Sequence, residues 1–108
     1  MVESRSQIKE IISIYREKLT QAGIKVAAVY LFGSYAHGLA HEGSDIDLII
    51  VSLDFEGLNM RERLELLGLA SARILEPIQA YGLTPEEVEK HKLNPFWLNI
   101  LENEAMLV

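Results

Sequence analysis

Two aspartates one residue apart, Asp45 and Asp47, constrain the fold of this chain more than any other feature, because they open the apolar run LIIVSL. An earlier apolar run, VAAVYLF, leads directly into Gly33 and Ser34. Both runs are short, rich in β-branched residues and bounded by Gly, Ser and Asp, which is typical of strands. The sequence therefore predicts that the Gly-Ser pair leaves one strand and that the aspartates begin the next.

The two aspartate side chains are expected to share one face of the second strand, since successive side chains point to opposite faces. Their Cα atoms would then lie about 6.6 Å apart, twice the rise per residue. Carboxylates at that spacing can bind a pair of metal ions together, because the two ions of a phosphoryl-transfer site lie ~3.5–4 Å apart. Hard Mg²⁺ prefers oxygen ligands. Asp45 and Asp47 are therefore predicted to be metal ligands at a catalytic site.

Gly33 and Ser34 are predicted to bind the phosphates of a nucleotide. Gly33 has no Cβ, so a phosphate can approach the backbone closely. Ser34 and Tyr35 are expected to begin a short helix that Gly38 ends, and the free N–H groups at such a start attract anions. The Ser34 hydroxyl can also donate to a phosphate oxygen. A phosphate site and a metal site are thus expected side by side.

The rest of the chain alternates helical and extended patterns. Apolar spacing, capping residues and prolines predict helices over residues 4–22, 60–73, 85–91 and 95–103, and strands over 26–32, 45–53, 74–81 and 105–108. No repeat or low-complexity tract interrupts these patterns. We expect one α/β domain over residues 1–108, built as a small mixed sheet with helices mainly on one face.

Glu76 lies in the third apolar stretch, ILEPIQAY, where two interpretations are open. Pro77 cannot donate a ladder hydrogen bond and so favours an edge strand, on which Glu76 would be a solvent-facing charge. Alternatively, strands ~4.8 Å apart would bring Glu76 beside Asp45 and Asp47 as a third metal ligand and catalytic residue. Spacing alone leaves both interpretations open.

Composition limits the classes of partner. The chain carries a net charge of −6 and no basic stripe of the kind that grips a nucleic-acid backbone, so nucleic acid is not an expected partner. No apolar run approaches the ~20 residues that span a bilayer, and the start has no signal-peptide core, so membrane contact is not expected either. Cysteine is absent, which excludes disulfides and thiolate metal sites and is compatible with a reducing cytoplasm.

The stretch GSYAHGLAHEGSDIDL resembles the signature of nucleotidyltransferases of the DNA polymerase β superfamily. Its local form is similar to the minimal nucleotidyltransferase (MNT) branch, small proteins often paired with a HEPN-domain toxin. The resemblance covers nearly the whole chain, although the terminal NPFWLNILENEAMLV lacks the glycine and tyrosine of the family's tail. It implies transfer of AMP from ATP, with Gly33 and Ser34 at the triphosphate and two Mg²⁺ ions on Asp45 and Asp47. It also favours Glu76 as the third carboxylate.

The resemblance further implies a protein partner. Nothing after the predicted core looks like a substrate-recognition domain, so the acceptor hydroxyl would be presented by a second subunit or by a separate protein. By resemblance that protein is a HEPN toxin, and the chain would be its antitoxin. The competing hypothesis is an antitoxin that binds nucleotide but neutralises its partner by occlusion, without turnover. An enzyme that modifies a small molecule is disfavoured by the missing helical substrate domain.

Overall fold

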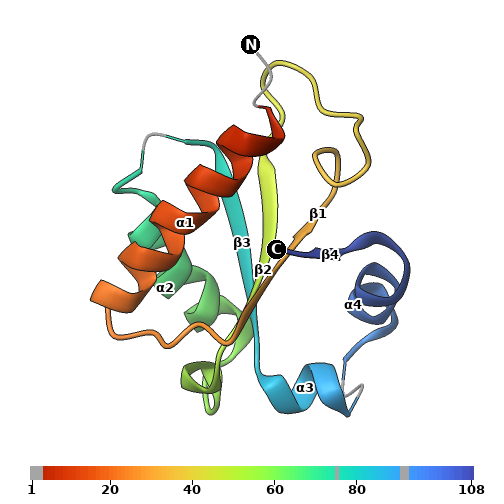
Figure 1. The fold of residues 1–108 in the computed structure, drawn as a ribbon. Coiled ribbons are helices and arrows are strands. Elements are labelled where there is room, and N and C mark those ends of the chain that lie inside the picture. The colour runs from red at the N-terminus through yellow and green to blue at the C-terminus, as the bar shows by residue number, and fades with distance from the viewer. Residues whose placement is uncertain (1–3, 75, 91–92) are drawn as a thin grey trace.

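The computed structural model describes residues 4–74, 76–90 and 93–108, and within these ranges four strands form one mixed sheet (Figure 1). Along the chain the elements are α1 (Arg5–Gln21), β1 (Ala28–Phe32), β2 (Ile46–Val51), a 3₁₀ turn (Leu53–Phe55), α2 (Met60–Ser71), β3 (Ile78–Leu83), α3 (Pro85–Glu89), α4 (Pro95–Asn99), a π-helical turn (Ile100–Glu104) and β4 (Met106–Leu107). The strand order is β3-β2-β1-β4, with β1 antiparallel to both its neighbours and β2 parallel to β3. The expected mixed α/β fold is confirmed.

The N-terminal helix α1 begins and ends close to where the sequence predicts. The Ser4 hydroxyl accepts a hydrogen bond from the Gln7 amide, and the Gln7 side chain accepts one from the Ser4 amide. Gly23 follows the last turn with a φ of 90°, the conformation that favours glycine after a helix. The buried Tyr15 hydroxyl donates to the Leu67 carbonyl of α2 at 2.8 Å, so the two long helices are joined on one side of the sheet (Figure 1).

Strand alternation divides the apolar residues of the sheet between two cores. The buried sheet residues on the α1–α2 side are Val29, Leu31, Ile46, Leu48, Ile50 and Ala80. A smaller core on the other side contains Ile49, Val51, Leu83 and Ile100. Because side chains alternate along a strand, Asp47 lies on the face of this smaller core. The long helices thus cover one face, as predicted, and the C-terminal helices lie over the other, which the aspartate pair shares.

Three aromatic rings extend the smaller core toward the rim of the sheet. Phe32 of β1, Tyr81 of β3 and Trp97 of α4 lie with ring centroids 5.0–6.0 Å apart. Trp97 is therefore a packing residue, whereas the neighbouring Phe96 is 57% exposed. Since Phe32 directly precedes Gly33, the C-terminal segment supports the strand end from which the candidate site begins.

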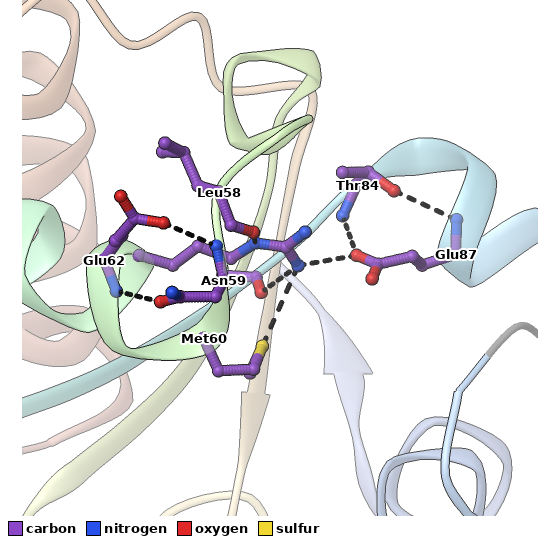
Figure 2. A network of polar contacts seen from close by, with 8 residues as sticks. Leu58, Asn59, Met60, Glu62, Thr84 and Glu87 are labelled. Atoms are coloured by element: carbon purple, nitrogen blue, oxygen red, sulfur yellow. Dashed lines mark hydrogen bonds and ion pairs between the residues drawn. The ribbon is translucent and has the colours of Figure 1, made fainter.

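A buried arginine, Arg63 of α2, ties the end of β3 to the start of α3. Its guanidinium donates to the Leu58 carbonyl at 3.0 Å, the Gly82 carbonyl at 3.1 Å and the Glu87 carboxylate at 2.7 Å. Glu87 also accepts from the Thr84 amide, and the Thr84 hydroxyl caps α3 (Figure 2). The sequence does not predict this network, because Arg63 falls within an amphipathic helix where a charged residue is ordinarily exposed.

The third strand begins later than predicted. We expected residues 74–81, whereas β3 spans Ile78–Leu83. Pro77 has no N–H to contribute, and its carbonyl accepts from the Ile46 amide of β2 at 2.7 Å just before the strand starts. The edge position predicted from Pro77 is confirmed, since β3 ends the strand order. Glu76 consequently precedes the strand instead of lying within it.

The C-terminal elements follow their capping signals. The Thr84 hydroxyl accepts from the Glu87 amide and Pro85 is the first residue of α3, as predicted. The predicted end of this helix at residue 91 lies outside the described residues. Asn94 caps α4, which passes into the π-helical turn before β4 pairs with β1. None of the helices in the described ranges is both long enough and apolar enough to cross a membrane.

Candidate functional site

Asp45 and Asp47 lie at the rim of the sheet, where β1 ends and β2 begins. Asp47 pairs with Phe32, the last residue of β1, in the antiparallel register. Asp45 directly precedes β2, and its carboxylate lies near enough to Asp47 to raise the pKa of that group. Asp45 is exposed and Asp47 is half-buried. The geometry expected for the pair is therefore present.

Gly33 leaves the space that the Asp47 carboxylate occupies. Its φ is 75°, in the left-handed region that favours glycine. A Cβ built on Gly33 would overlap Asp47 Oδ2 and would lie 3.2 Å from Asp47 Cγ. The backbone conformation and the carboxylate thus both require glycine at this position. The antiparallel register in this way brings the Gly-Ser pair directly beside the aspartates.

Ser34 lies in a turn and not in the short helix that we predicted. The Ala36 amide donates to the Gly33 carbonyl at 3.1 Å, and the Leu39 amide donates to the Ser34 carbonyl at 2.9 Å. Gly38, with a φ of 70°, closes this turn before a helix can propagate. The half-buried Ser34 still follows Gly33 at the rim. A single turn has no substantial helix dipole, so any phosphate contact depends on local N–H groups and on the Ser34 hydroxyl.

The two carboxylates repel each other. Burial raises the pKa of Asp47 above its ordinary value, and the neighbouring Asp45 carboxylate raises it further. Like charges disfavour ionisation at a shared site. A divalent cation between the two groups would remove this repulsion, which makes the rim suited to a metal ion.

A short hydrogen-bonded loop leads into Asp45. The His41 amide donates to the Ser44 hydroxyl at 2.9 Å, and the Ser44 amide donates to the His41 carbonyl at the same distance. Ser44 is buried, and Gly43 beside it has a φ of 89°. The loop therefore positions the chain as it enters the rim. The role of Ser44 was not predicted, although a Gly-Ser pair before an aspartate is a typical turn signal.

The structure does not bring Glu76 to the aspartate pair. Glu76 lines a shallow hollow together with the α1 residues Gln7, Glu10, Ile11 and Ile14. Helix α1 covers the sheet face opposite to the one that Asp47 occupies. Within the described residues, no three His, Cys, Asp or Glu side chains are grouped so that they could hold a metal ion. The predicted juxtaposition of Glu76 with Asp45 and Asp47 is therefore not found.

The parallel register explains where Glu76 lies. Asp47 of β2 pairs with Gln79 of β3, and Ile46 pairs with Ile78. Ile78 packs against the α1–α2 core, and Glu76, which precedes it across Pro77, lies against α1. The residue that the register sets beside Asp47 is Gln79, a carboxamide. This assignment depends on the strand pairing, which spacing along the chain does not reveal.

A larger hollow, of about 730 Å³, lies away from the aspartates. It is bordered by α1, β4 and the turn after Gly33, and the charged residues in its lining are Arg5, Lys9 and Arg16. Its floor includes Leu31, whose side chain belongs to the α1–α2 core. The hollow consequently opens on the face opposite Asp47. The larger hollow is therefore not the candidate site at Asp45 and Asp47.

Residues 8–101 match the nucleotidyltransferase domain family. The chain belongs to this family. It is 32% identical over 108 residues to a provisionally named protein adenylyltransferase of Methanocaldococcus jannaschii, a match that covers 99% of this chain and 100% of the relative. The family match includes the whole stretch from Gly33 to Asp47. The nucleotidyltransferase predicted from that stretch is thus confirmed at the level of the family.

Solved structures of similar fold include two toxin–antitoxin complexes. A toxin–antitoxin complex with AMP-PNP aligns with a TM-score of 0.60 at 21% identity, covering 93% of this chain and 70% of that one. A tri-AMPylated HEPN toxin of Shewanella oneidensis in complex with its MNT antitoxin aligns with a TM-score of 0.52 at 18% identity, covering 93% and 66%. The similarity to MNT antitoxins inferred from the sequence therefore extends to the architecture.

Proposed function

We propose that this chain is a Mg²⁺-dependent adenylyltransferase that moves AMP from ATP to a hydroxyl group of a partner protein. The observation that carries the proposal is the Asp47 carboxylate packed against the Gly33 backbone, with Asp45 on the same face. Carboxylates beside an open backbone turn suit a triphosphate and its metal ions. The name of the M. jannaschii relative and the AMP-PNP in a complex of similar fold support the same reaction.

The donor set at the rim fits Mg²⁺. Asp45 and Asp47 offer hard, anionic oxygen atoms, which Mg²⁺ prefers, and the raised pKa of Asp47 reflects a repulsion that a cation would relieve. These two residues would hold the ions together with the phosphates of the nucleotide. Bound Mg²⁺ supplies charge stabilisation to the transferring phosphoryl group.

Gly33 and Ser34 would bind the triphosphate. At Gly33 the missing side chain leaves the backbone accessible, and its left-handed φ turns the chain so that Ser34 follows at the rim. The Ser34 hydroxyl would donate to a phosphate oxygen. Binding at this position would hold the triphosphate beside the Asp47 carboxylate, which lies against Gly33.

The reaction exchanges a phosphoanhydride bond of ATP for a phosphate ester bond to the acceptor. The acceptor hydroxyl oxygen forms a bond to the α-phosphorus of ATP, and the bond from that phosphorus to the oxygen that bridges it to the β-phosphorus breaks. Pyrophosphate leaves with the bonding electrons, and the hydroxyl proton passes to water. The role of this chain is to position the two reactants and to stabilise charge.

The acceptor is proposed to belong to a HEPN toxin. The Asp45–Asp47 face is exposed at Asp45, while the rest of that face carries the aromatic cluster and the C-terminal helices. An acceptor would therefore approach from outside the sheet rim, as a hydroxyl on another protein does. The AMPylated toxin in a complex of similar fold supports this class of acceptor.

A second candidate function is occlusion of the toxin without turnover. It is favoured by one observation: among the described residues, no third carboxylate joins Asp45 and Asp47. Such a site would bind nucleotide and metal but transfer AMP slowly or not at all.

Intact-mass spectrometry of the toxin separates the two functions. The HEPN partner would be incubated with ATP, Mg²⁺ and either the wild-type chain, Asp47→Asn or the surface control Glu56→Gln. A mass gain of one or more AMP units with wild type and with Glu56→Gln, but not with Asp47→Asn, would support transfer. Tight binding and inhibition by all three proteins without any mass gain would establish occlusion instead.

A further inference from the structure

Gln79 is the side chain that the sheet sets next to Asp47. The parallel register pairs the two residues directly, and neighbouring strands lie ~4.8 Å apart. Tyr81 and Leu83, which follow at alternate positions on β3, pack into the smaller core on the Asp47 face or against it. Gln79 therefore shares that face, and it is exposed at the rim.

The chemistry of Gln79 differs from that of its two neighbours. A carboxamide oxygen can coordinate Mg²⁺, but it carries no charge and does not accept a proton at neutral pH. The described acidic residue nearest along the chain, Glu76, lies against α1 on the other face. Among the described residues, two carboxylates would thus bind two metal ions at this rim. Phosphate oxygens of the nucleotide would have to supply the rest of the negative charge that balances the two cations.

We propose that Gln79 occupies the third ligand position of the metal site, and that its neutral side chain leaves the second metal ion weakly bound. The inference rests on the proposed function, because it takes Asp45 and Asp47 to be the other ligands. The strength of a site for hard divalent cations follows the number of charged ligands. One metal ion per chain is therefore held tightly together with nucleotide, and the second is held weakly.

Mn²⁺ binding tests the inference without relying on activity. The concentration of free Mn²⁺ would be measured by electron paramagnetic resonance in the presence of AMP-PNP, for the wild-type chain and for four variants. Gln79→Glu should tighten the weaker Mn²⁺ site by about tenfold or more, as expected when a charged ligand is added. Ser6→Glu, which adds the same charge on the exposed start of α1, should leave it unchanged. Glu76→Gln should also bind Mn²⁺ like wild type.

The other possible Mn²⁺-binding results distinguish failure of the Gln79 inference from failure of the proposed function. If Gln79→Glu and Ser6→Glu bind Mn²⁺ alike, or if Glu76→Gln weakens binding, the assignment of Gln79 is overturned. If Asp47→Asn, the fourth variant, keeps both Mn²⁺ sites at wild-type affinity, the proposed function itself fails. Loss of tight Mn²⁺ binding in Asp47→Asn with no gain in Gln79→Glu overturns the inference alone. Thermal melting monitors folding, which the exposed position of Gln79 should leave unchanged.

Discussion

The Asp47 carboxylate lies against the backbone of Gly33, in space that any side chain on Gly33 would fill. The two residues are separated by the whole loop between β1 and β2, and they meet because the last residue of β1 pairs with Asp47. The phosphate-binding and metal-binding halves of the proposed site are thus one structural unit. A change in either half is expected to disturb the other.

Gly33→Ala should abolish the site while leaving most of the fold. The added methyl group would displace the Asp47 carboxylate, so Mn²⁺ and AMP-PNP binding should weaken at least about tenfold, as when a metal ligand is misplaced. Gly57→Ala is the matched control: its φ of 80° is similar, but nothing lies within 4 Å of the added Cβ. Both variants should lose about 1–2 kcal/mol of unfolding free energy through backbone strain. Equal nucleotide binding by the two variants, measured by calorimetry, would contradict the prediction.

Asp47→Asn should stabilise the metal-free protein at neutral pH. Burial, and then repulsion by Asp45, raise the pKa of Asp47, so its ionisation disfavours the folded state. The stability that Asp47 contributes is present below its ordinary pKa and is lost as the pH rises through the raised pKa. The variant should therefore melt at a higher temperature than wild type at pH 7, and the two should converge near pH 3, below the ordinary pKa of about 3.9.

A control for that experiment is Asp54→Asn. The Asp54 carboxylate accepts a hydrogen bond from the Lys25 amide at 2.7 Å, so removing its charge should not raise the melting temperature. A lower melting temperature for Asp47→Asn than for wild type at pH 7 would show that Asp47 is structurally required instead of strained.

Arg63→Met should be the most destabilising single change among those considered. It would remove the guanidinium donor from the Glu87 carboxylate, the buried Gly82 carbonyl and the half-buried Leu58 carbonyl, and breaking a buried ion pair costs up to about 3–5 kcal/mol. Arg61→Met is the matched control, because its ion pair with Glu65 is on the exposed surface of the same helix and is worth less than about 0.5 kcal/mol. Urea denaturation measures both, and similar midpoints for the two variants would refute the role given to Arg63.

Glu87→Gln should make the free energy of unfolding depend less on pH under acidic conditions. Burial alone would raise the pKa of Glu87, but hydrogen bonds from the Thr84 amide and from Arg63 outweigh burial and lower it. The stability contributed by a carboxylate of lowered pKa is present above its ordinary value and is lost as the pH falls through the lowered one. Wild type should therefore lose stability below about pH 4, the ordinary range of Glu, faster than the variant does in parallel urea titrations.

Helix boundaries and the aspartate rim could be predicted because their signals are local. Ser4, Asn59 and Thr84 each cap a helix at the start that the local sequence pattern predicts. The shared face of Asp45 and Asp47 follows from strand alternation alone. For such features, neighbouring residues contain all the information needed.

The features that were not predicted depend on contacts between distant segments. The pairing of β2 with β3 sets Gln79, and not Glu76, beside Asp47. The burial of Arg63 depends on acceptors at Gly82 and Glu87, far along the chain. The predicted helix at Ser34 was wrong for a local reason, since the hydrogen bonds there span three residues, from Ala36 to Gly33, and five, from Leu39 to Ser34, instead of the four of an α-helix.

The packing of Trp97 on Phe32 has a consequence for the order in which the protein can assemble. These rings are 65 positions apart in the sequence, and contacts of such long range form slowly because the loop between them must close first. The rim that follows Phe32 is therefore complete only once the C-terminal segment has docked. Nucleotide and metal bound there would select the fully folded chain and, by mass action, protect its C-terminal helices from local unfolding.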